Sequence, residues 1–173
     1  TPIHLSTAYG HPGLGESTGY DYTRTASPTR DVLQDALARL EGGTSAFALS
    51  SGMAALELVT RTLAPHGSRI VALRDLYGGS FRFLEVLAEE VAARVDFVLG
   101  LEGLCGALAD PVDLVIIETP TNPMMEEISI PEATELAHAA GARLVVDNTF
   151  YTPVVQRPLE LGADVVVHSG TKY

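Results

Sequence analysis

Short β-branched runs alternate with longer helix-forming stretches along most of the sequence, and this order constrains the fold more than any other feature. The runs expected to form strands are residues 47–49, 70–73, 96–99, 114–117, 144–146 and 165–167. The stretches expected to form helices are residues 29–41, 52–63, 81–93 and 131–140. Alternating strands and helices are typical of an α/β fold, and we expect a mostly parallel sheet with helices on both faces.

Two segments show this pattern most clearly. In residues 29–41, apolar side chains recur at the spacing of one helical face, and Gly42 and Gly43 follow as a stop signal. Residues 114–117 read LVII, a continuous apolar run that is typical of a strand buried on both faces. An amphipathic helix and a strand of this kind fit together as layers of one α/β domain.

The composition limits the class of protein and its partners. Of the 173 residues, 46% are hydrophobic and 19% are charged, which is typical of an ordered globular chain. The formal net charge of −11 argues against nucleic acid or an anionic membrane as a partner, because phosphate groups would repel the chain. The single cysteine, Cys105, excludes an intrachain disulfide framework, and no apolar run is long enough to span a membrane. We therefore expect a soluble, cytoplasmic protein.

The two ends of the sequence predict its domain organisation. Residues 7–27 are rich in Gly, Tyr, Ser and Thr without a period, so we expect residues 1–28 to form an extended N-terminal arm. An α/β domain is expected over residues 29–173. No basic segment followed by an apolar one opens the sequence, so no secretory signal is expected. The sequence stops soon after residues 165–167 without a covering helix, and we expect it to be the front part of a longer protein.

Polar segments that contain glycine, proline or asparagine follow several of the expected strands. These segments are residues 50–53, 75–79, 118–123, 147–149 and 168–172. Ligands of open α/β sheets bind beyond the carboxyl ends of the strands, where such segments meet. The sequence therefore predicts a ligand site at one edge of the sheet.

Small and hydroxyl-bearing residues in two of these segments are suited to bind an anion. Ser51, Gly52 and Met53 open an expected helix, either as a simple N-cap or as a phosphate seat made by free backbone N–H groups. Ser169 and Thr171 are either loop residues or hydroxyl donors to the same phosphate. The residues alone leave both interpretations open.

Three further residues carry chemistry that a bound organic cofactor would use. Asp147 follows an apolar strand and is either a turn residue or a carboxylate that pairs with a protonated ring nitrogen. Lys172 is either a solvated surface lysine or, where it loses hydration, a nucleophile toward carbonyl carbons. Tyr77 is either a packing residue or a ring that stacks on a planar ligand.

An anion seat, a carboxylate for a ring nitrogen, a stacking aromatic ring and a nucleophilic lysine together match the needs of pyridoxal 5′-phosphate (PLP). The glycine fingerprint of dinucleotide sites and the Walker loop are both absent from the sequence. We expect no metal site, because His4, His11, His66 and His138 show no metal-ligand spacing. PLP is therefore the expected cofactor.

Motifs along nearly the whole sequence carry a family resemblance. They are YTRTASPTR at 22–30, LEGG at 40–43, SGMA at 51–54, DLYGG at 75–79, ETPTNP at 118–123, VDNTF at 146–150, PLELGAD at 158–164 and HSGTKY at 168–173. In this order they resemble the Cys/Met-metabolism PLP enzymes, the trans-sulfuration group of fold-type I. That group includes cystathionine γ-synthase, cystathionine γ-lyase and cystathionine β-lyase. The resemblance implies the large, PLP-binding domain of fold-type I, without the C-terminal domain.

The resemblance implies roles for individual residues. Lys172 would form the Schiff base with PLP and shuttle protons, and Asp147 would pair with the pyridine nitrogen. Tyr77 would stack on the ring and assist proton transfer, while Asn122 would lie near the phenolic oxygen of the ring. The residues implied to hold the phosphate are Ser51, Gly52, Met53, Ser169 and Thr171.

The resemblance also implies an assembly. In this family a tyrosine and an arginine spaced like Tyr22 and Arg24 reach the phosphate of a neighbouring subunit, so the arm would complete a neighbour's site. The implied state is a homo-oligomer, a dimer of dimers. Methionine γ-lyases often carry a cysteine where this sequence has Gly79, which favours the cystathionine enzymes and the sulfhydrylases. The arginine that binds the substrate carboxylate lies in the family's C-terminal domain, outside this sequence.

The main functional hypothesis is a PLP-dependent lyase or transferase with a small amino-acid substrate. It would eliminate or replace a β- or γ-substituent of a sulfur amino acid or of O-acylhomoserine. Methionine γ-lyase and homoserine sulfhydrylase are alternatives within the family. A truncated PLP-binding or assembly fragment without activity alone is a second hypothesis, and another fold-type I enzyme such as an aminotransferase is a third. The substrate, the leaving group and the choice between β- and γ-chemistry stay open.

Overall fold

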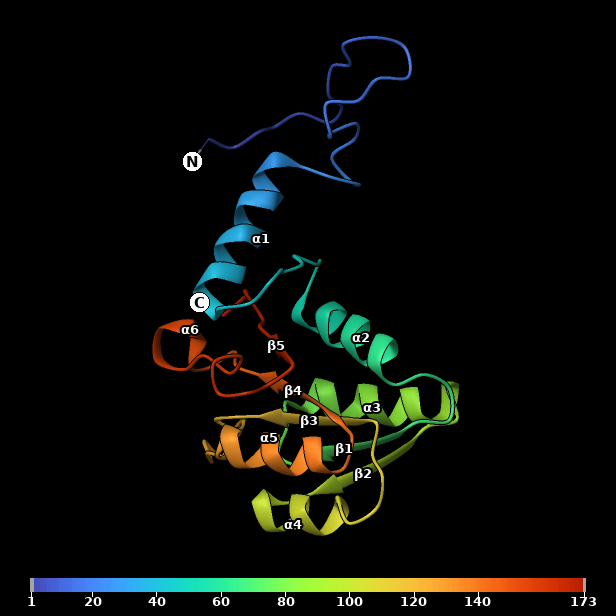
Figure 1. The fold of residues 1–173 in the computed structure, drawn as a ribbon, viewed down its shortest axis with the longest axis vertical. Helices are drawn as coiled ribbons and strands as arrows, with labels where there is room; N and C mark the ends of the chain where they lie inside the picture. Colours follow the sequence, from blue (N-terminus) through green and yellow to red (C-terminus); the bar gives the residue numbers. More distant parts are fainter. Residues whose placement is uncertain (1, 173) are drawn as a thin grey trace. The chain divides into compact units, whose positions relative to one another are not determined.

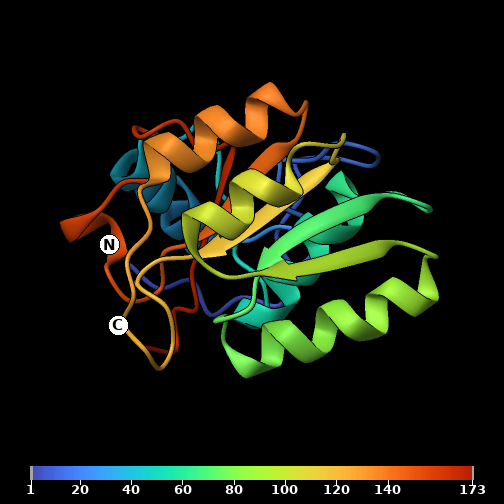
Figure 2. The same ribbon diagram turned by 90° about the horizontal axis from the view of Figure 1, so that it is seen from below.

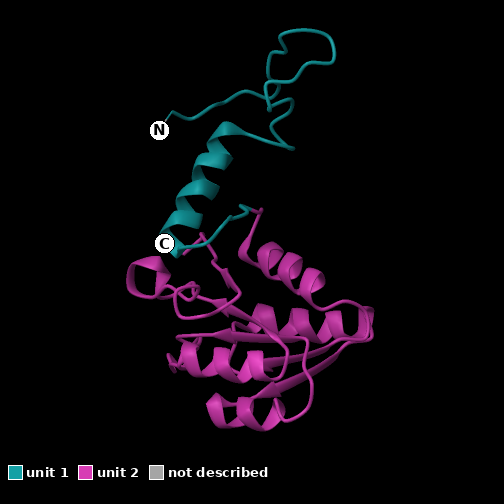
Figure 3. Ribbon diagram, viewed as in Figure 1, with its two compact units in different colours: residues 1–48 teal, residues 49–173 magenta. Residues whose placement is uncertain are grey.

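The computed structural model describes residues 2–172 and divides the chain into two compact units, Thr1–Ala48 and Leu49–Tyr173 (Figure 3). The first unit holds the segment expected to be an arm and one helix, and the second unit holds the sheet. Tyr173, which ends the last motif of the expected PLP site, lies outside the described residues.

The first unit opens with a looped segment that forms no helix and only one isolated bridge among residues 2–27. Ala8 and Tyr22 make this bridge in antiparallel orientation. The rings of Tyr9 and Tyr20 pack with their centroids 5.5 Å apart. The segment therefore folds back on itself, and its expected contact with a neighbouring subunit stays a prediction.

Helix α1 (Pro28–Glu41) completes the regular structure of the first unit. Proline in its first turn fits, because the first helical N–H groups have no intrahelical acceptor. The helix ends at Gly42, whose φ of 70° is the left-handed conformation that glycine adopts without steric cost. The helix predicted over residues 29–41 is confirmed, with a start one residue earlier.

Within the described part of the chain, five strands form one parallel sheet (Figure 1). They are β1 (Arg69–Leu73), β2 (Arg94–Val98), β3 (Leu114–Glu118), β4 (Arg143–Asp147) and β5 (Val165–Val167). Their order across the sheet is β2-β1-β3-β4-β5, and all neighbours are parallel. The predicted α/β class and mostly parallel sheet are confirmed.

Helices cover both faces of this sheet. They are α2 (Gly52–Leu63), α3 (Gly78–Glu90), α4 (Gly100–Ala107) and α5 (Ile130–Ala139), with the short α6 (Thr152–Val155) before β5. Helices α4 and α5 pack together on one face, whereas α3, against which α2 packs, lies on the opposite face (Figure 2). All residues of the central strand β3 are buried between these layers, as its continuous apolar sequence predicts.

The strand order creates a topological switch point between β1 and β3. From the carboxyl end of β1 the chain enters α3 on one face, whereas from β3 it continues to α5 on the other face. Ligands of open α/β sheets bind in the crevice where such connections diverge. Residues 74–77 and 119–123 therefore flank the place where this fold would receive a ligand.

The structure corrects two expectations about the elements. Residues 47–49 form no strand, because Phe47 is 73% exposed and Leu49 is 41% exposed at the junction of the two units, and no described strand pairs with them. Helix α3 begins at Gly78 instead of residue 81. Glycine is a poor helix former, so the two glycines of its first turn conceal the true start.

The sequence pattern does not predict α4 or α6. Helix α4 contains Gly100, Gly103 and Gly106, which lower its helix propensity, yet its Leu104 is fully buried. Burial of an apolar side chain against the sheet therefore overrides the local preference. Helix α6 has four residues, too few for a helical period to be visible in the sequence.

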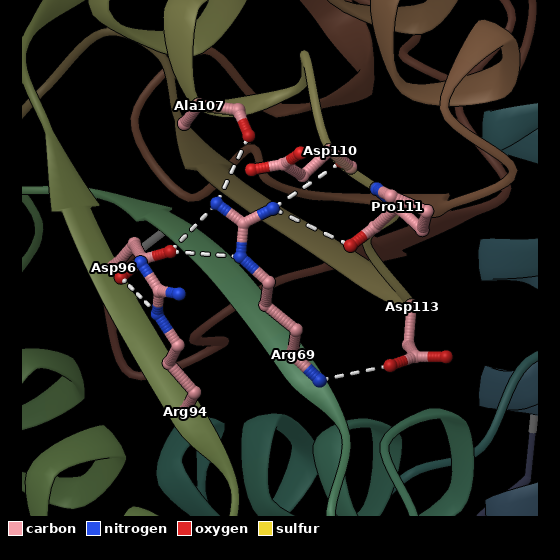
Figure 4. A network of polar contacts seen from close by, with 7 residues as sticks. All are labelled: Arg69, Arg94, Asp96, Ala107, Asp110, Pro111 and Asp113. Atoms are coloured by element: carbon pink, nitrogen blue, oxygen red, sulfur yellow. Dashed lines mark hydrogen bonds and ion pairs between the residues drawn. The ribbon is translucent and has the colours of Figure 1, made fainter.

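A polar cluster joins four segments at the amino ends of the strands (Figure 4). The guanidinium of Arg69, at the start of β1, donates from Nε to Asp96 Oδ2 on β2 at 2.9 Å. Its Nη2 donates to the carbonyl of Ala107, at the end of α4, at 3.0 Å. Its Nη1 donates to the carbonyls of Asp110 and Pro111 at 3.2 and 3.3 Å. Arg69 therefore stabilises the sheet at the edge opposite the candidate site.

A second polar cluster surrounds Asp164, just before β5. Its Oδ2 accepts from the backbone N–H of Leu144 at 2.8 Å and bonds to His138 Nε2 at 2.9 Å. Its Oδ1 accepts from Arg143 at 2.8 Å. Burial favours the neutral carboxyl group, but these hydrogen bonds outweigh it and hold the pKa of Asp164 below its ordinary value.

Across residues 2–172, none of the helices has both the length and the apolar character required to cross a lipid bilayer. Over the same residues, His, Cys, Asp and Glu side chains form no group of three or more that could hold a metal ion.

Candidate active site

The start of α2 lies against the segment that follows β5. A Cβ built at Gly52 would stand 2.9 Å from Ser169 Cβ and 3.1 Å from Ser169 Cα. Ordinary contacts of a Cβ lie between 3.4 and 4 Å, so a larger residue at position 52 requires Ser169 to move. The structure therefore brings together two of the segments that the sequence places at this edge.

The first turn of α2 presents backbone N–H groups at this junction. Ser51 is the N-cap, and its Oγ accepts from Ala54 N–H at 3.1 Å. The N–H groups of Gly52 and Met53 have no hydrogen-bond acceptor within residues 2–172. Unpaired N–H groups at the positive end of a helix dipole can seat an anion such as a phosphate group.

Ser169 connects this junction with Lys172 and with the end of β4. Lys172 Nζ donates to Ser169 Oγ at 3.3 Å. Ser169 N–H donates to Thr149 Oγ1 at 2.9 Å, and this hydroxyl donates to Asp147 Oδ1 at 2.6 Å. A chain of polar contacts therefore runs from Lys172 to Asp147.

Asp147 ends β4 and keeps one carboxylate oxygen available. Its Oδ1 accepts from both the N–H and the hydroxyl of Thr149, while Oδ2 has no hydrogen-bond donor among the residues that the structure describes. A carboxylate oriented in this way can stabilise a protonated nitrogen. Sequence reasoning missed Thr149, although a residue two positions after an aspartate commonly completes such a turn.

Tyr77 is the N-cap of α3 and lies on one side of the switch point. Its side chain is 45% exposed. A Cβ built at Gly79 would overlap the Tyr77 ring, so any side chain at position 79 displaces the ring from its present place. The absence of a side chain at position 79 therefore allows the present orientation of the Tyr77 ring.

Asn122 lies on the other side of the switch point, in the turn over residues 119–123. This turn contains two cis peptide bonds, Thr119–Pro120 and Asn122–Pro123. Asn122 is half-buried, and its side-chain amide makes no hydrogen bond within the described part of the chain. The amide is thus available to a ligand.

Sequence reasoning assigned no role to Glu118, the last residue of β3. Glu118 is 6% exposed, and its Oε2 accepts the backbone N–H of Tyr77 at 2.7 Å. The backbone N–H of Asn122 also lies near enough to this carboxyl group to lower its pKa, and Glu118 pairs with Asp147 in the register of β3 and β4. Burial raises the pKa of Glu118 to about 7; the charge of Asp147 adds to this, and the two N–H groups oppose it. A carboxylate directly after a continuous apolar run was the signal in the sequence.

Lys172 and Thr171 are both exposed in the described part of the chain, so a nucleophilic role of Lys172 stays a prediction. Lys172 follows β5, a three-residue strand that pairs only with β4 among the described strands. Thr171 makes no side-chain hydrogen bond within residues 2–172. Lys172 is nevertheless distinctive, since it is the only lysine in the sequence.

Tyr22 and Arg24 belong to the first unit and contact each other. Arg24 Nε donates to the Tyr22 hydroxyl, and the guanidinium carbon lies 5.1 Å from the centroid of the Tyr22 ring. This distance is typical of a cation–π contact. The pair is therefore formed within the unit, and its expected contact with a phosphate group stays a prediction.

One hollow of the described chain has a volume of about 370 Å³ and is lined by residues 153–157, 160 and 161. It contains none of the candidate residues. A hollow at the carboxyl edge, beside Leu73 and Thr121, measures only about 10 Å³. The arrangement of polar groups, and not the size of a cavity, therefore locates the candidate site.

Comparisons with known proteins show the family to which the chain belongs. A model of the family described as Cys/Met metabolism PLP-dependent enzyme matches residues 1–173. A cystathionine gamma-synthase/O-acetylhomoserine (thiol)-lyase from Bacillus subtilis is 47% identical and aligns with 99% of this chain and 46% of its own length. A cystathionine gamma-synthase from Haemophilus influenzae is 48% identical over 99% of this chain and 47% of its own length.

A solved structure of a member of this family has a similar fold. The cystathionine gamma synthase from Xanthomonas oryzae pv. oryzae, in complex with aminoacrylate and cysteine, superposes with a TM-score of 0.94 at 42% identity. The match covers 99% of this chain and 45% of the other. The chain thus spans about half the length of the proteins that it matches.

Proposed function

Because the chain belongs to the family of Cys/Met metabolism PLP-dependent enzymes, we propose that it forms the cofactor-binding part of a trans-sulfuration enzyme. The proposed reaction is β- or γ-elimination, or γ-replacement, on a sulfur amino acid or on O-acylhomoserine. The names of the relatives from B. subtilis and H. influenzae support this substrate class. The cofactor of the family is pyridoxal 5′-phosphate.

The observation that supports this proposal most strongly is the contact of three segments beyond the sheet. Gly52 at the start of α2 abuts Ser169, Lys172 Nζ lies 3.3 Å from Ser169 Oγ, and Asp147 is reached through Thr149. An anion seat, an amine and a carboxylate are the groups that PLP requires of a protein. The residues present therefore fit the cofactor.

The phosphate group is assigned to the start of α2 and to the segment after β5. The free N–H groups of Gly52 and Met53 would donate to it, with Ser51 holding the turn as the N-cap. The hydroxyls of Ser169 and Thr171 would add two further donors. Ser169 packs against Gly52 in this turn, and Thr171 follows Ser169 by two residues.

Lys172 and Asp147 are assigned the proton chemistry. When bound, PLP supplies an electron sink for negative charge that develops at the α-carbon of an amino acid. Lys172 would hold the aldehyde carbon of the cofactor and, once the substrate amine replaces it, remove the α-proton. Asp147 Oδ2 would keep a proton on the ring nitrogen, because a neighbouring carboxylate stabilises the cation.

Tyr77 and Asn122 are assigned contacts with the ring itself. They flank the switch point from opposite sides, with Tyr77 after β1 and Asn122 after β3. Tyr77 would stack on the ring and assist proton transfer, and the free side-chain amide of Asn122 would lie near the phenolic oxygen. Both side chains have the exposure needed to contact a ligand.

The assembly proposed is a cytoplasmic homo-oligomer, a dimer of dimers, in which the arm of one subunit completes the site of another. The pairing of Arg24 with Tyr22 supports this, because it presents a cation beside a hydroxyl on one surface of the first unit. A second activity within the same family, O-acetylhomoserine thiol-lyase, is favoured by the name of the B. subtilis relative.

The visible absorption of the full chain mixed with PLP tests the proposal. We expect a band that differs from that of free PLP, and we expect both Lys172→Ala and Lys172→Arg to abolish it. Lys172→Arg is the matched control, because it keeps the charge and removes the nucleophilic amine. A Lys172→Ala chain that keeps the band, or that turns over cystathionine or O-acylhomoserine, would contradict the assignment.

A further inference from the structure

Glu118 bridges the two sides of the switch point. It ends β3, yet its Oε2 accepts the N–H of Tyr77, in the segment that leaves β1 for α3, at 2.7 Å. The backbone N–H of Asn122, in the turn that leaves β3 for the opposite face, lies near enough to the same carboxyl group to lower its pKa. One side chain therefore interacts with both segments whose divergence opens the crevice, through a hydrogen bond to one and an electrostatic attraction to the other.

The bridge is buried, and buried polar groups are strongly constrained. Glu118 is 6% exposed, so its carboxyl group has exchanged water for the N–H of Tyr77, to which it is hydrogen-bonded, and for the nearby N–H of Asn122. Removing a hydrogen-bond partner from such a group leaves the other partner unpaired, which costs more than the same bond contributes at a surface. The positions of Tyr77 and Asn122 are therefore coupled to the position of this one carboxylate.

The group lies beside the other carboxylate of the site. Asp147 on β4 pairs with Glu118 across the strands, and its charge reinforces the effect of burial on the pKa of Glu118. Placing a buried carboxylate beside Asp147 costs free energy, because both groups carry negative charge when ionised. The N–H groups of Tyr77 and Asn122 offset part of this cost, because they favour the ionised form of Glu118.

We propose that Glu118 is a positioning residue for the cofactor ring, which fixes the backbones of Tyr77 and Asn122 around the ring seat beside Asp147. This inference rests on the proposed function, since the ring contacts of Tyr77 and Asn122 belong to that proposal. Glu118 acts through these two residues and makes no contact with the reacting atoms.

The test compares three variants of the full chain. Glu118→Gln keeps the size of the side chain but offers one acceptor oxygen and a competing amide donor. Glu118→Asp keeps the charge, but its side chain is one methylene shorter, so the carboxylate lies further from the N–H of Tyr77. It replaces the glutamine variant in the test if that variant does not fold. Glu126→Gln is the matched control, because Glu126 is an exposed glutamate in the segment after the same strand.

Two measurements are made on each variant. Hydrogen exchange at the amides of Tyr77 and Asn122, without cofactor, reports whether Glu118 holds these backbones. The dissociation constant and the visible circular dichroism of added PLP report whether that hold orients the ring. We expect exchange at one or both amides to be about tenfold faster, and PLP affinity about tenfold weaker, in both Glu118 variants. The Glu126→Gln control should match the wild type within about twofold in both measurements.

The outcomes separate this inference from the function on which it rests. A wild-type chain that binds no PLP contradicts the proposed function and, with it, any positioning of the ring. A wild-type chain that binds PLP, together with Glu118 variants whose affinity and dichroism are unchanged, overturns the role of Glu118 alone. Faster amide exchange with unchanged PLP binding also overturns it, because Glu118 would then hold the backbone without serving the cofactor.

Discussion

Replacement of Gly52 by alanine tests the junction on which the candidate phosphate site depends. The added Cβ would stand 2.9 Å from Ser169 Cβ, whereas ordinary contacts begin at 3.4 Å, so the two segments must separate by about half an ångström. Ser169 Cα is also only 3.1 Å away, which prevents relief by rotation of the serine side chain. Overpacking of this kind destabilises a protein by about 1–3 kcal/mol.

The measurement is a pair of titrations and melting curves on the full chain. A loss of about 1–3 kcal/mol lowers the melting temperature by roughly 2–4 °C for each kcal/mol in a chain of this size. If the displaced groups bind the phosphate, the affinity for PLP should fall about tenfold, which corresponds to about 1.4 kcal/mol. Gly106→Ala is the control, because a Cβ at Gly106 in α4 meets no atom within 4 Å.

The control is expected to change stability in the opposite direction. Alanine in a helix is more stable than glycine by about 0.5–1 kcal/mol, so Gly106→Ala should raise the melting temperature and leave PLP affinity unchanged. A Gly52→Ala chain that melts no lower than the wild type and binds PLP equally well would refute the reasoning. It would mean that the start of α2 and Ser169 do not meet as described.

Three further results are expected for stability. Arg69→Met should destabilise the chain by about 2 kcal/mol in urea unfolding, because it removes the shared donor of the partly buried Asp96 carboxylate and of three backbone carbonyls in the Figure 4 cluster. The exposed Arg157→Met should change it by less than about 1 kcal/mol. Hydrogen bonds hold the pKa of Asp164 below its ordinary value despite burial. The stability that Asp164 contributes is therefore present above about pH 4 and is lost as the pH falls further. Asp164→Asn should weaken this loss of stability in acid, and an unchanged dependence of the melting temperature on pH would contradict it. Burial raises the pKa of Glu118 from 4.5 to about 7, so the folded chain binds that proton more tightly than the unfolded chain. Stability should therefore decline as the pH rises from about 5 to 8, and Glu118→Gln should flatten the decline measured by thermal unfolding without cofactor.

The sheet could be predicted because its strands carry their own signal. The apolar run of β3 has few alternatives to a strand buried on both faces. Residues 165–167 also form the strand that their apolar run predicts, although only Val167 is buried. Residues 47–49 show the limit of this argument, because a short apolar run becomes a strand only where a neighbour pairs with it. Helix α4 shows the opposite case, where burial of Leu104 decides against the preference of three glycines.

The candidate site could be predicted only in part. Chain order places Gly52, Asp147 and Ser169 at the carboxyl edge, and the contact between Gly52 and Ser169 agrees with that placement. The role of Glu118 depends on which backbone N–H groups lie near its carboxylate, from the N-cap of α3 and from the turn after β3. The sequence shows only a carboxylate after an apolar run, and these contacts become visible only in three dimensions.

The sequence leaves open whether Lys172 is solvated or loses its hydration. A lysine loses hydration only where other elements cover it, and Lys172 is exposed in the described part of the chain. Its position is still informative, because Ser169 Oγ lies 3.3 Å from its Nζ and the anion seat adjoins the same serine.

Reductive trapping of the chain with PLP and borohydride, followed by mass spectrometry of its peptides, tests the central claim most directly. Lys172 is the only lysine in the sequence, so a covalent bond between PLP and a lysine side chain can form at one place alone. We expect the mass of the reduced cofactor on the peptide that contains Lys172, and a clear reduction of labelling when Gly52→Ala disturbs the phosphate seat. A chain that binds PLP but carries no label on Lys172 would contradict the claim that this edge of the sheet is the cofactor site.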